Sequence, residues 1–241
     1  MKVIVTKNYD DMSAEAAKIL IDVIKNKPDC TLGLATGSTP VGTYDRMVAA
    51  YERGEISFGN VSSVNLDEYY PIAPTDPQSY RYFMNENLFD RVDIDRSRTF
   101  VPDGTAQSVE EACAAHEAVI DRLGIDVQIL GIGRNGHIGF NEPDGELIRD
   151  THLTALTADT INANSRFFEK ESDVPRHALT MGIASVFKAK SILLLASGKN
   201  KAEAIRTLLC GGITTSCPAS LLCLHPDVTV ICDEDAYSLV K

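Results

Sequence analysis

Short apolar runs of strand length alternate with amphipathic runs of helix length along the sequence, and this alternation narrows the possible folds more than any other feature. Several runs of strand length are apolar at almost every position, for example 127–132 and 192–196. A strand that is apolar throughout is buried on both faces, which is typical of a parallel sheet covered by helices. The sequence therefore predicts an α/β fold with a mostly parallel sheet.

The predicted elements follow each other without a long linker, a repeat or a low-complexity segment. The predicted strands are 3–5, 31–35, 61–66, 127–132, 192–196 and 228–232, with 152–156 and 178–181 as further candidates. The predicted helices are 11–25, 41–51, 79–89, 108–123, 201–209 and 218–224. We therefore expect one three-layer domain over residues 1–241, with helices on both faces of the sheet.

Composition and charge disfavour several classes of partner. The 241 residues are 44% hydrophobic and 24% charged, which is ordinary for a globular domain. The formal net charge of -11 disfavours nucleic acids and anionic membranes as partners. No apolar run approaches the roughly 18 residues of a membrane span, and the N-terminal segment lacks the pattern of a signal peptide. We expect a cytoplasmic protein.

The six cysteines do not form a convincing metal or disulfide pattern. A chain of this length without a secretion signal is expected to keep its thiols reduced. Cys217, Cys223, His225 and Cys232 could be taken for a zinc site, but the usual two-residue spacing between ligands is missing. We predict no bound metal.

Residues 34–40, Leu-Ala-Thr-Gly-Ser-Thr-Pro, follow a predicted strand and open a predicted helix. Gly37 allows a tight turn, and Pro40 suits the first helical turn, where a missing N–H costs nothing. Ser38 and Thr39 add hydroxyl groups beside the free backbone N–H groups that bind anions at a helix start. The segment is neither a Walker motif nor a G-x-G-x-x-G loop. It fits a phosphate site and a plain helix cap about equally well.

Residues 65–71, Asn-Leu-Asp-Glu-Tyr-Tyr-Pro, place two adjacent carboxylates at the end of a predicted strand. Asp67 and Glu68 point to opposite faces if the strand continues, so they need not share a role. A carboxylate at this edge of a sheet can serve as a general base. An acidic turn or a cap is the simpler explanation when the segment is considered alone.

Residues 131–143, Gly-Ile-Gly-Arg-Asn-Gly-His-Ile-Gly-Phe-Asn-Glu-Pro, form a glycine-rich loop after the strand 127–132. Glycines permit positive φ angles and a close approach of the backbone to a ligand. His137 can exchange a proton near neutral pH, and Glu142 can fold back to support the imidazole. This combination indicates a functional site.

Two further cations are candidate phosphate ligands, although each is more often a surface charge. Arg166 lies in Asn-Ser-Arg-Phe-Phe, and Lys201 follows Ser-Gly-Lys-Asn near a predicted helix start. A cation at a helix start opposes the helix dipole, and a bound anion would offset that conflict.

These segments together resemble the glucosamine-6-phosphate isomerase/deaminase family. The resemblance covers nearly the whole chain in the expected order, through T-G-S-T-P, N-L-D-E-Y, G-I-G-R-N-G-H-I-G-F-N-E-P, N-S-R-F-F, A-L-T-M-G-I, L-H-P and C-D-E. It implies a single Rossmann-like domain with a small lid segment at about 159–175. It also implies hydrolytic deamination of D-glucosamine 6-phosphate to D-fructose 6-phosphate and ammonia, with no cofactor.

The resemblance further implies a role for each matching residue. Asp67 would be the base for enolisation, and His137 would move the protons of ring opening beside Glu142. The residues that would hold the substrate phosphate are Thr36, Gly37, Ser38, Thr39, Arg166 and Lys201.

Asn135 departs from the commonest pattern of the family, which has Asp at this position. Asn carries no charge, but it can accept a hydrogen bond from the imidazole and fix its tautomer. We therefore expect Glu142 to supply the charge support for His137.

Three alternatives stay open at this stage. A galactosamine-6-phosphate deaminase would differ only at the 4-hydroxyl of the substrate. A phosphosugar lactonase would share the fold, but it would not need a C2 base. A sugar-phosphate sensor domain would bind without turnover, and the strong negative charge disfavours its usual DNA-binding context. We expect a monomer or a small homo-oligomer, without the allosteric site for an N-acetylated sugar phosphate that some relatives carry.

Overall fold

A computed structural model describes residues 1–157, 160–161, 170 and 174–240. Its main feature is a seven-stranded sheet in which all neighbouring strands pair in parallel. The strands in spatial order are β1 (Lys2–Thr6), β10 (Val228–Asp233), β9 (Ser191–Ala196), β6 (Val127–Gly131), β2 (Thr31–Leu34), β3 (Ser62–Asn65) and β5 (Thr99–Phe100).

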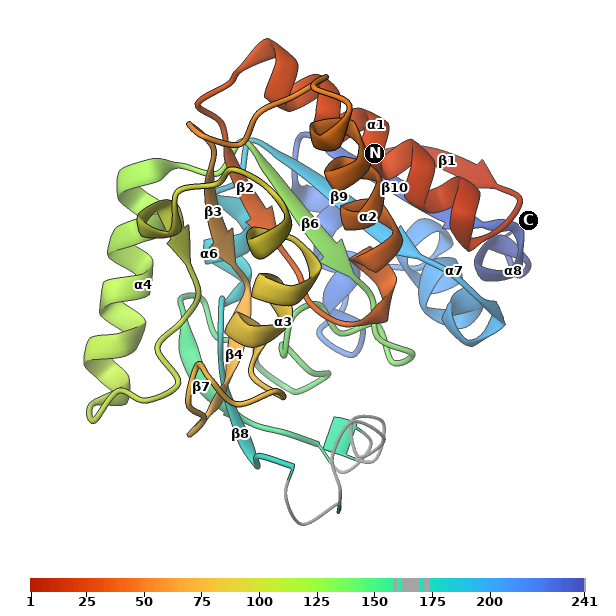
Figure 1. Cartoon of the computed structure of the whole chain (residues 1–241). Helices are drawn as coiled ribbons and strands as arrows, with labels where there is room; N and C mark the ends of the chain where they lie inside the picture. Colours follow the sequence, from red (N-terminus) through yellow and green to blue (C-terminus); the bar gives the residue numbers. More distant parts are fainter. Residues whose placement is uncertain (158–159, 162–169, 171–173, 241) are drawn as a thin grey trace.

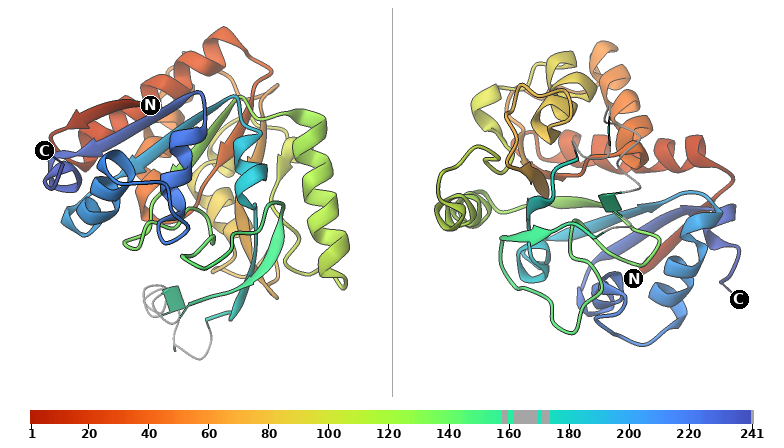
Figure 2. Two further views of the ribbon diagram at one scale, coloured as in Figure 1. Left: turned by 180° about the vertical axis from the view of Figure 1, so that it is seen from behind. Right: turned by 90° about the horizontal axis from the view of Figure 1, so that it is seen from below.

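Helices cover both faces of this sheet, as the sequence predicts (Figures 1 and 2). On one face lie α1 (Tyr9–Asn26), α2 (Ser38–Glu52) and α3 (Tyr80–Asn87), while α6 (Ile183–Phe187) and α7 (Ala202–Cys210) lie on the other. Two further α-helices are α4 (Val109–Leu123), near the β3–β5 side of the sheet, and α8 (Glu234–Tyr237), directly after β10.

The apolar pattern of each element explains its place. In α1 the buried side chains recur at helical spacing, at Met12, Ala16, Leu20 and Ile24, and Asn8 caps the first turn by accepting a hydrogen bond from the backbone N–H of Asp11. β9 is buried at every position after its first, which is the burial expected of an inner strand of a covered parallel sheet.

The chain reverses its direction of travel across the sheet between β2 and β6. From β2 it moves to β3 and β5, and from β6 it moves the opposite way to β9 and β10. In open sheets of this kind, ligands bind where the strand order reverses, outside the carboxyl ends of the strands. The fold therefore directs attention to the loops that follow β2, β6 and β9.

A second, antiparallel sheet begins shortly after the chain leaves strand β3 of the large sheet. It contains β4 (Asp67–Tyr70), β8 (His177–Thr180) and β7 (His152–Ala155), in that order. It extends beyond the large sheet at the lower side of Figure 1. Tyr69 and Phe140 belong to a separate apolar cluster at this sheet.

The structure corrects the predicted strand 61–66. β3 ends at Asn65, and Leu66 joins the two sheets: its N–H donates to Leu34 O at 3.1 Å, and its carbonyl accepts from Met181 N at 2.8 Å. Asp67 is consequently the first residue of the second sheet rather than the residue after a strand.

Other predictions have mixed outcomes. The candidate strands 152–156 and 178–181 are strands, but they form the antiparallel sheet and not the parallel one. The two-residue strand β5 and the short helix α6 carry too few residues for a periodic signal, and neither was predicted. Most of the predicted lid at 159–175 lies outside the described residues. That residues 1–241 form a single domain stays a prediction.

All six cysteines are unpaired. No helix within the described ranges is long and apolar enough to cross a membrane.

A half-buried carboxylate ties α4 to the start of β7 and to α6. Glu117 Oε1 accepts hydrogen bonds from Thr151 N at 2.8 Å, from Thr151 Oγ1 at 2.6 Å and from Ser185 Oγ, while Oε2 pairs with Lys188 Nζ at 2.8 Å. Burial raises the pKa of Glu117, but the bonds to Lys188, Ser185 and Thr151 outweigh it and lower that pKa to about 2.

We expect Glu117→Gln to lower the free energy of unfolding by about 2 kcal/mol at neutral pH, because the hydrogen bonds to a charged acceptor weaken. The carboxylate pKa is lowered in the folded state, so its contribution is present above the unfolded value and is lost as the pH falls toward 2. Denaturant unfolding at pH 7 and pH 3 measures this, and the difference between wild type and variant should shrink at pH 3. Glu111→Gln, at an exposed site on the same helix, is the matched control. An equal loss in both variants would contradict this account.

Candidate active site

The glycine-rich loop after β6 holds three of the predicted catalytic side chains in direct contact. His137 Nδ1 lies 3.1 Å from Glu142 Oε2, and Asn135 Nδ2 donates to the same oxygen at 2.6 Å. The carboxylate can only accept, so Nδ1 carries the proton and Nε2 of a neutral imidazole is left as the basic nitrogen. Burial raises the pKa of Glu142, but the bonds to His137, Thr160 and Asn135 outweigh it and lower that pKa to about 2.

The expected role of Asn135 is wrong in its detail. The Asn135 side chain does not receive a hydrogen bond from the imidazole; its Oδ1 accepts the backbone N–H of His137 at 3.2 Å. Its amide nitrogen meanwhile donates to Glu142. Asn135 therefore fixes the loop and the carboxylate, and it is Glu142 that contacts the imidazole Nδ1, as expected for the charge support.

The glycines of this loop are required by close contacts. A Cβ on Gly133 would collide with the ring of His137, and the Gly133 N–H donates to the carbonyl of His137 at 2.9 Å. Gly136 has a φ of 84°, and a Cβ there would collide with Cys217 Sγ. The imidazole is thus packed directly against the backbone of its own loop.

Asp67 lies beside this loop, although 70 residues separate it from His137 in the sequence. Its side chain is buried, with 6% of the residue exposed. A Cβ built on Gly139 would lie 3.6 Å from Asp67 Oδ2, an ordinary van der Waals distance, so the loop backbone passes directly in front of the carboxyl group. Burial, with a smaller effect of the neighbouring Glu68, raises the pKa of Asp67 to about 8.

Glu68 has a separate, structural role. Its Oε1 accepts the N–H of Tyr80 at 2.7 Å and its Oε2 accepts that of Arg81 at 2.9 Å, so it caps the start of α3. The sequence left a cap open for this pair of carboxylates, and the structure assigns it to Glu68, buried rather than solvated.

The turn between β2 and α2 has the features of an anion site. Gly37 is the N-cap, with a φ of 90°, and no side chain caps the helix there. The N–H groups of the first turn are therefore available to a ligand, next to Thr36, Ser38 and Thr39. Tyr9 fixes this turn, because its hydroxyl donates to Ser38 O and accepts from Gly42 N, both at 2.9 Å.

Lys201 connects the loop after β9 with the loop after β6. It follows Gly198, whose N–H donates to Asp233 at 3.0 Å, and its Nζ donates to Ile132 O at 2.7 Å. Ile132 is the residue immediately before Gly133, so Lys201 stands at the base of the loop that carries His137. Arg166, the other predicted cation, lies outside the described residues.

Sequence reasoning missed two groups at this site. Thr160 Oγ1 donates to Glu142 Oε1 at 2.6 Å, and no periodic pattern or motif marks that threonine. The rings of Tyr69, Tyr80 and Phe140 form an aromatic group, with Tyr80 stacked on Phe140 at 6.1 Å between centroids. The three rings are far apart in the sequence, so no local pattern predicts that they meet, although Tyr69 and Phe140 lie in segments that the sequence analysis singled out.

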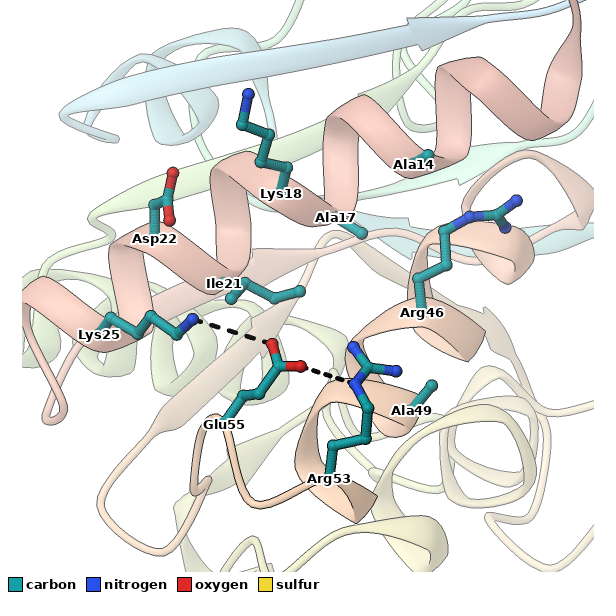
Figure 3. Close-up of a pocket in the computed structure, with 10 residues that line it drawn as sticks. All are labelled: Ala14, Ala17, Lys18, Ile21, Asp22, Lys25, Arg46, Ala49, Arg53 and Glu55. Atoms are coloured by element: carbon teal, nitrogen blue, oxygen red, sulfur yellow. Dashed lines mark hydrogen bonds and ion pairs between the residues drawn. The ribbon is translucent and has the colours of Figure 1, made fainter.

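A hollow of about 290 Å³ lies elsewhere, over the outer surfaces of α1 and α2 (Figure 3). Two of its charged side chains, Lys25 and Arg53, both pair with Glu55. Within the described part of the chain, no cluster of three His, Cys, Asp or Glu side chains could hold a metal ion. His225, considered above as a zinc ligand, uses its ring nitrogens on backbone groups of Ala189 and Asp227.

Comparisons with known proteins agree with this geometry. The family model described as glucosamine-6-phosphate isomerases/6-phosphogluconolactonase matches residues 6–231. A glucosamine-6-phosphate deaminase of Thermoanaerobacter pseudethanolicus is 54% identical over 241 residues, covering all of this chain and 95% of that protein. One of Clostridium perfringens is 53% identical over 242 residues, covering both chains in full.

Solved structures give the same result. A monomeric glucosamine-6-phosphate deaminase superposes with a TM-score of 0.96 at 49% identity, covering 99% of this chain and 100% of that one. A 6-phosphogluconolactonase of Leishmania guyanensis superposes with a TM-score of 0.76 at 19% identity, which shows a shared fold alone. The chain belongs to the glucosamine-6-phosphate isomerase/6-phosphogluconolactonase family.

Proposed function

We propose that this protein is a glucosamine-6-phosphate deaminase, a hydrolase of a C–N bond that converts D-glucosamine 6-phosphate and water to D-fructose 6-phosphate and ammonia. One observation carries the proposal most: a buried carboxyl group, Asp67, faces a glycine-rich loop that holds a carboxylate-supported imidazole, His137. The names of the relatives with more than half of their residues identical support the same reaction.

His137 opens the sugar ring in this proposal. With Nδ1 donating to Glu142, Nε2 takes the proton of the anomeric hydroxyl and returns a proton to the ring oxygen. Glu142 stays ionised throughout the working pH range, because its pKa is about 2, and it stabilises the imidazolium that forms. The product of this step is the open-chain aldehyde.

Asp67 then moves the proton that isomerises the open chain. The aldehyde acidifies the C2 proton, Asp67 removes it, and the same carboxyl group returns it to C1. The C1 oxygen gains a proton as the enol forms, and the C2 amine loses one as C1 is protonated. This leaves an imine at C2, which water hydrolyses to the ketone with release of ammonia. The steps exchange protons, add water and release ammonia without an outside electron donor or acceptor, so the carbon skeleton is neither oxidised nor reduced overall.

The phosphate would be held away from the reacting carbons. The proposed ligands are the N–H groups and side chains of 36–39, with Lys201 from the β9 loop; Arg166 is added on the resemblance alone. Binding energy at this unreactive end orients C1 and C2 toward the catalytic groups. A monomeric state is supported by the likeness to a monomeric deaminase, and a cytoplasmic location stays a prediction.

Purified protein with D-glucosamine 6-phosphate should release ammonia and fructose 6-phosphate in equal amounts. The assay needs two controls, galactosamine 6-phosphate and 6-phosphogluconolactone, which test the epimer and the lactonase chemistry of the family. Faster turnover of either control, or binding of glucosamine 6-phosphate without product, would contradict the proposal.

We expect Asp67→Asn to abolish ammonia release while the protein still binds the phosphate ester, because the amide keeps the shape of the carboxyl group and cannot take a proton. Calorimetric binding alongside the ammonia assay measures both properties. If the variant loses binding as well as turnover, Asp67 is structural rather than catalytic.

The same variant should be more stable than wild type at alkaline pH. The folded-state pKa of Asp67 is raised, so wild type loses stability as the pH rises from about 4 through 8, whereas an amide does not ionise. The melting temperature of Asp67→Asn relative to wild type should therefore increase between pH 5 and pH 9. A difference that is constant over this range would contradict burial as the cause of the shift.

The pH profile should report the same carboxyl group. Asp67 acts as a base only when it is deprotonated, so kcat/KM should rise with pH up to about 8. In the enzyme–substrate complex the substrate ammonium lies beside Asp67 and favours the charged form of the carboxylate. The rise of kcat with pH should therefore occur at lower pH than the rise of kcat/KM. Initial rates from pH 5 to pH 9 test this prediction. If kcat and kcat/KM both complete their rise below pH 5, the prediction is contradicted.

A further inference from the structure

We propose that Thr160 is a positioning residue, which holds the Glu142 carboxylate in the orientation that serves His137. The inference rests on the proposed function, because it concerns His137 and Glu142, which open the sugar ring in that proposal. It assigns a role to a residue that no motif or periodic pattern in the sequence marks.

The two oxygens of Glu142 have different partners. Oε2 faces the catalytic loop, where it is bonded to His137 Nδ1 and Asn135 Nδ2. Oε1 faces the segment after β7, where Thr160 Oγ1 donates to it at 2.6 Å and Thr157 Oγ1 lies at 3.5 Å. The planar carboxylate is thus held at both ends, and rotation about its last bond would break the contact with His137.

Hydrogen bonds to Thr157 hold Thr160 in place beside Glu142. The Thr160 N–H donates to Thr157 Oγ1 at 3.2 Å, and the Ile161 N–H donates to Thr157 O at 2.9 Å. Thr157 therefore holds the backbone N–H groups of residues 160 and 161, and Thr160 makes the short bond to the carboxylate.

Burial makes this hydrogen bond consequential. Thr160 is 8% exposed, and the side chain of Glu142 is 10% exposed. A buried carboxylate oxygen that loses its short donor is under-solvated, so the group either turns toward another donor or admits water. Both outcomes weaken the support of the imidazole at Oε2.

The test compares Thr160→Val, which keeps the shape and removes the hydroxyl, with Thr160→Ser, which keeps the hydroxyl. Thr154→Val, on β7 just before this segment, is the matched control, since its hydroxyl contacts Ala155 O at 3.4 Å rather than Glu142. We expect Thr160→Val to lower kcat about tenfold, with Thr160→Ser restoring most of it, because a bond to a charged acceptor is lost and regained. KM should change less than about twofold.

A double-mutant cycle separates positioning from a general structural effect. If Thr160 acts through Glu142, adding Thr160→Val to Glu142→Gln should cost less than about twofold in kcat. The affinity for an acyclic sugar-alcohol phosphate, which has no ring to open, should be the same in Thr160→Val and wild type. Thr160→Ala repeats the comparison if the valine variant unfolds below the assay temperature.

Several results would overturn the inference. One is a kcat of Thr160→Val equal to that of wild type or of Thr154→Val. Another is that Thr160→Val lowers kcat by the same factor in the Glu142→Gln variant as in wild type. The third is that Thr160→Ser has a kcat as low as that of Thr160→Val. Wild-type protein that releases no ammonia would instead refute the proposed function, so the two failures are distinguishable.

Discussion

The main chain of Leu66 joins the two sheets, and the placement of Asp67 depends on that junction. Its N–H bonds to β2 of the parallel sheet, and its carbonyl bonds to Met181 after β8 of the antiparallel sheet. The chain therefore leaves the large sheet beside the point where the strand order reverses, and the next residue is Asp67. Register with β8 then sets Asp67 opposite Thr180, whose hydroxyl holds the backbone of the glycine-rich loop at Phe140.

The pKa values of two carboxyl groups near this junction are shifted in opposite directions by their surroundings. Asp67 is buried next to another acid, and its pKa rises to about 8. Glu142 is also partly buried, but hydrogen bonds from His137, Thr160 and Asn135 lower its pKa to about 2. Environments that separate two carboxyl pKa values in this way commonly divide roles between them. Here the proposed division is a proton-transferring Asp67 and a permanently charged Glu142.

The sequence predicted the layers of the fold, since continuous apolar strands and helical periodicity are local signals. It also predicted the His137–Glu142 contact, which spans five residues in a glycine-rich loop. It could not predict that Leu66 carries the chain from one sheet to the other, because that depends on the distant partners Leu34 and Met181. Thr160 was missed for the same reason: its partner Glu142 lies 18 residues away, and a lone threonine carries no pattern.

The central claim is that one shielded carboxyl group, Asp67, carries a proton between C2 and C1. Turnover of D-glucosamine 6-phosphate in D₂O, followed by NMR of the fructose 6-phosphate formed, measures it most directly. A single base on one face of the open chain delivers deuterium to only one of the two C1 positions, and deuterated C2 substrate in H₂O should keep part of its label at that position. Label distributed equally between both C1 positions in the first turnovers would contradict the account.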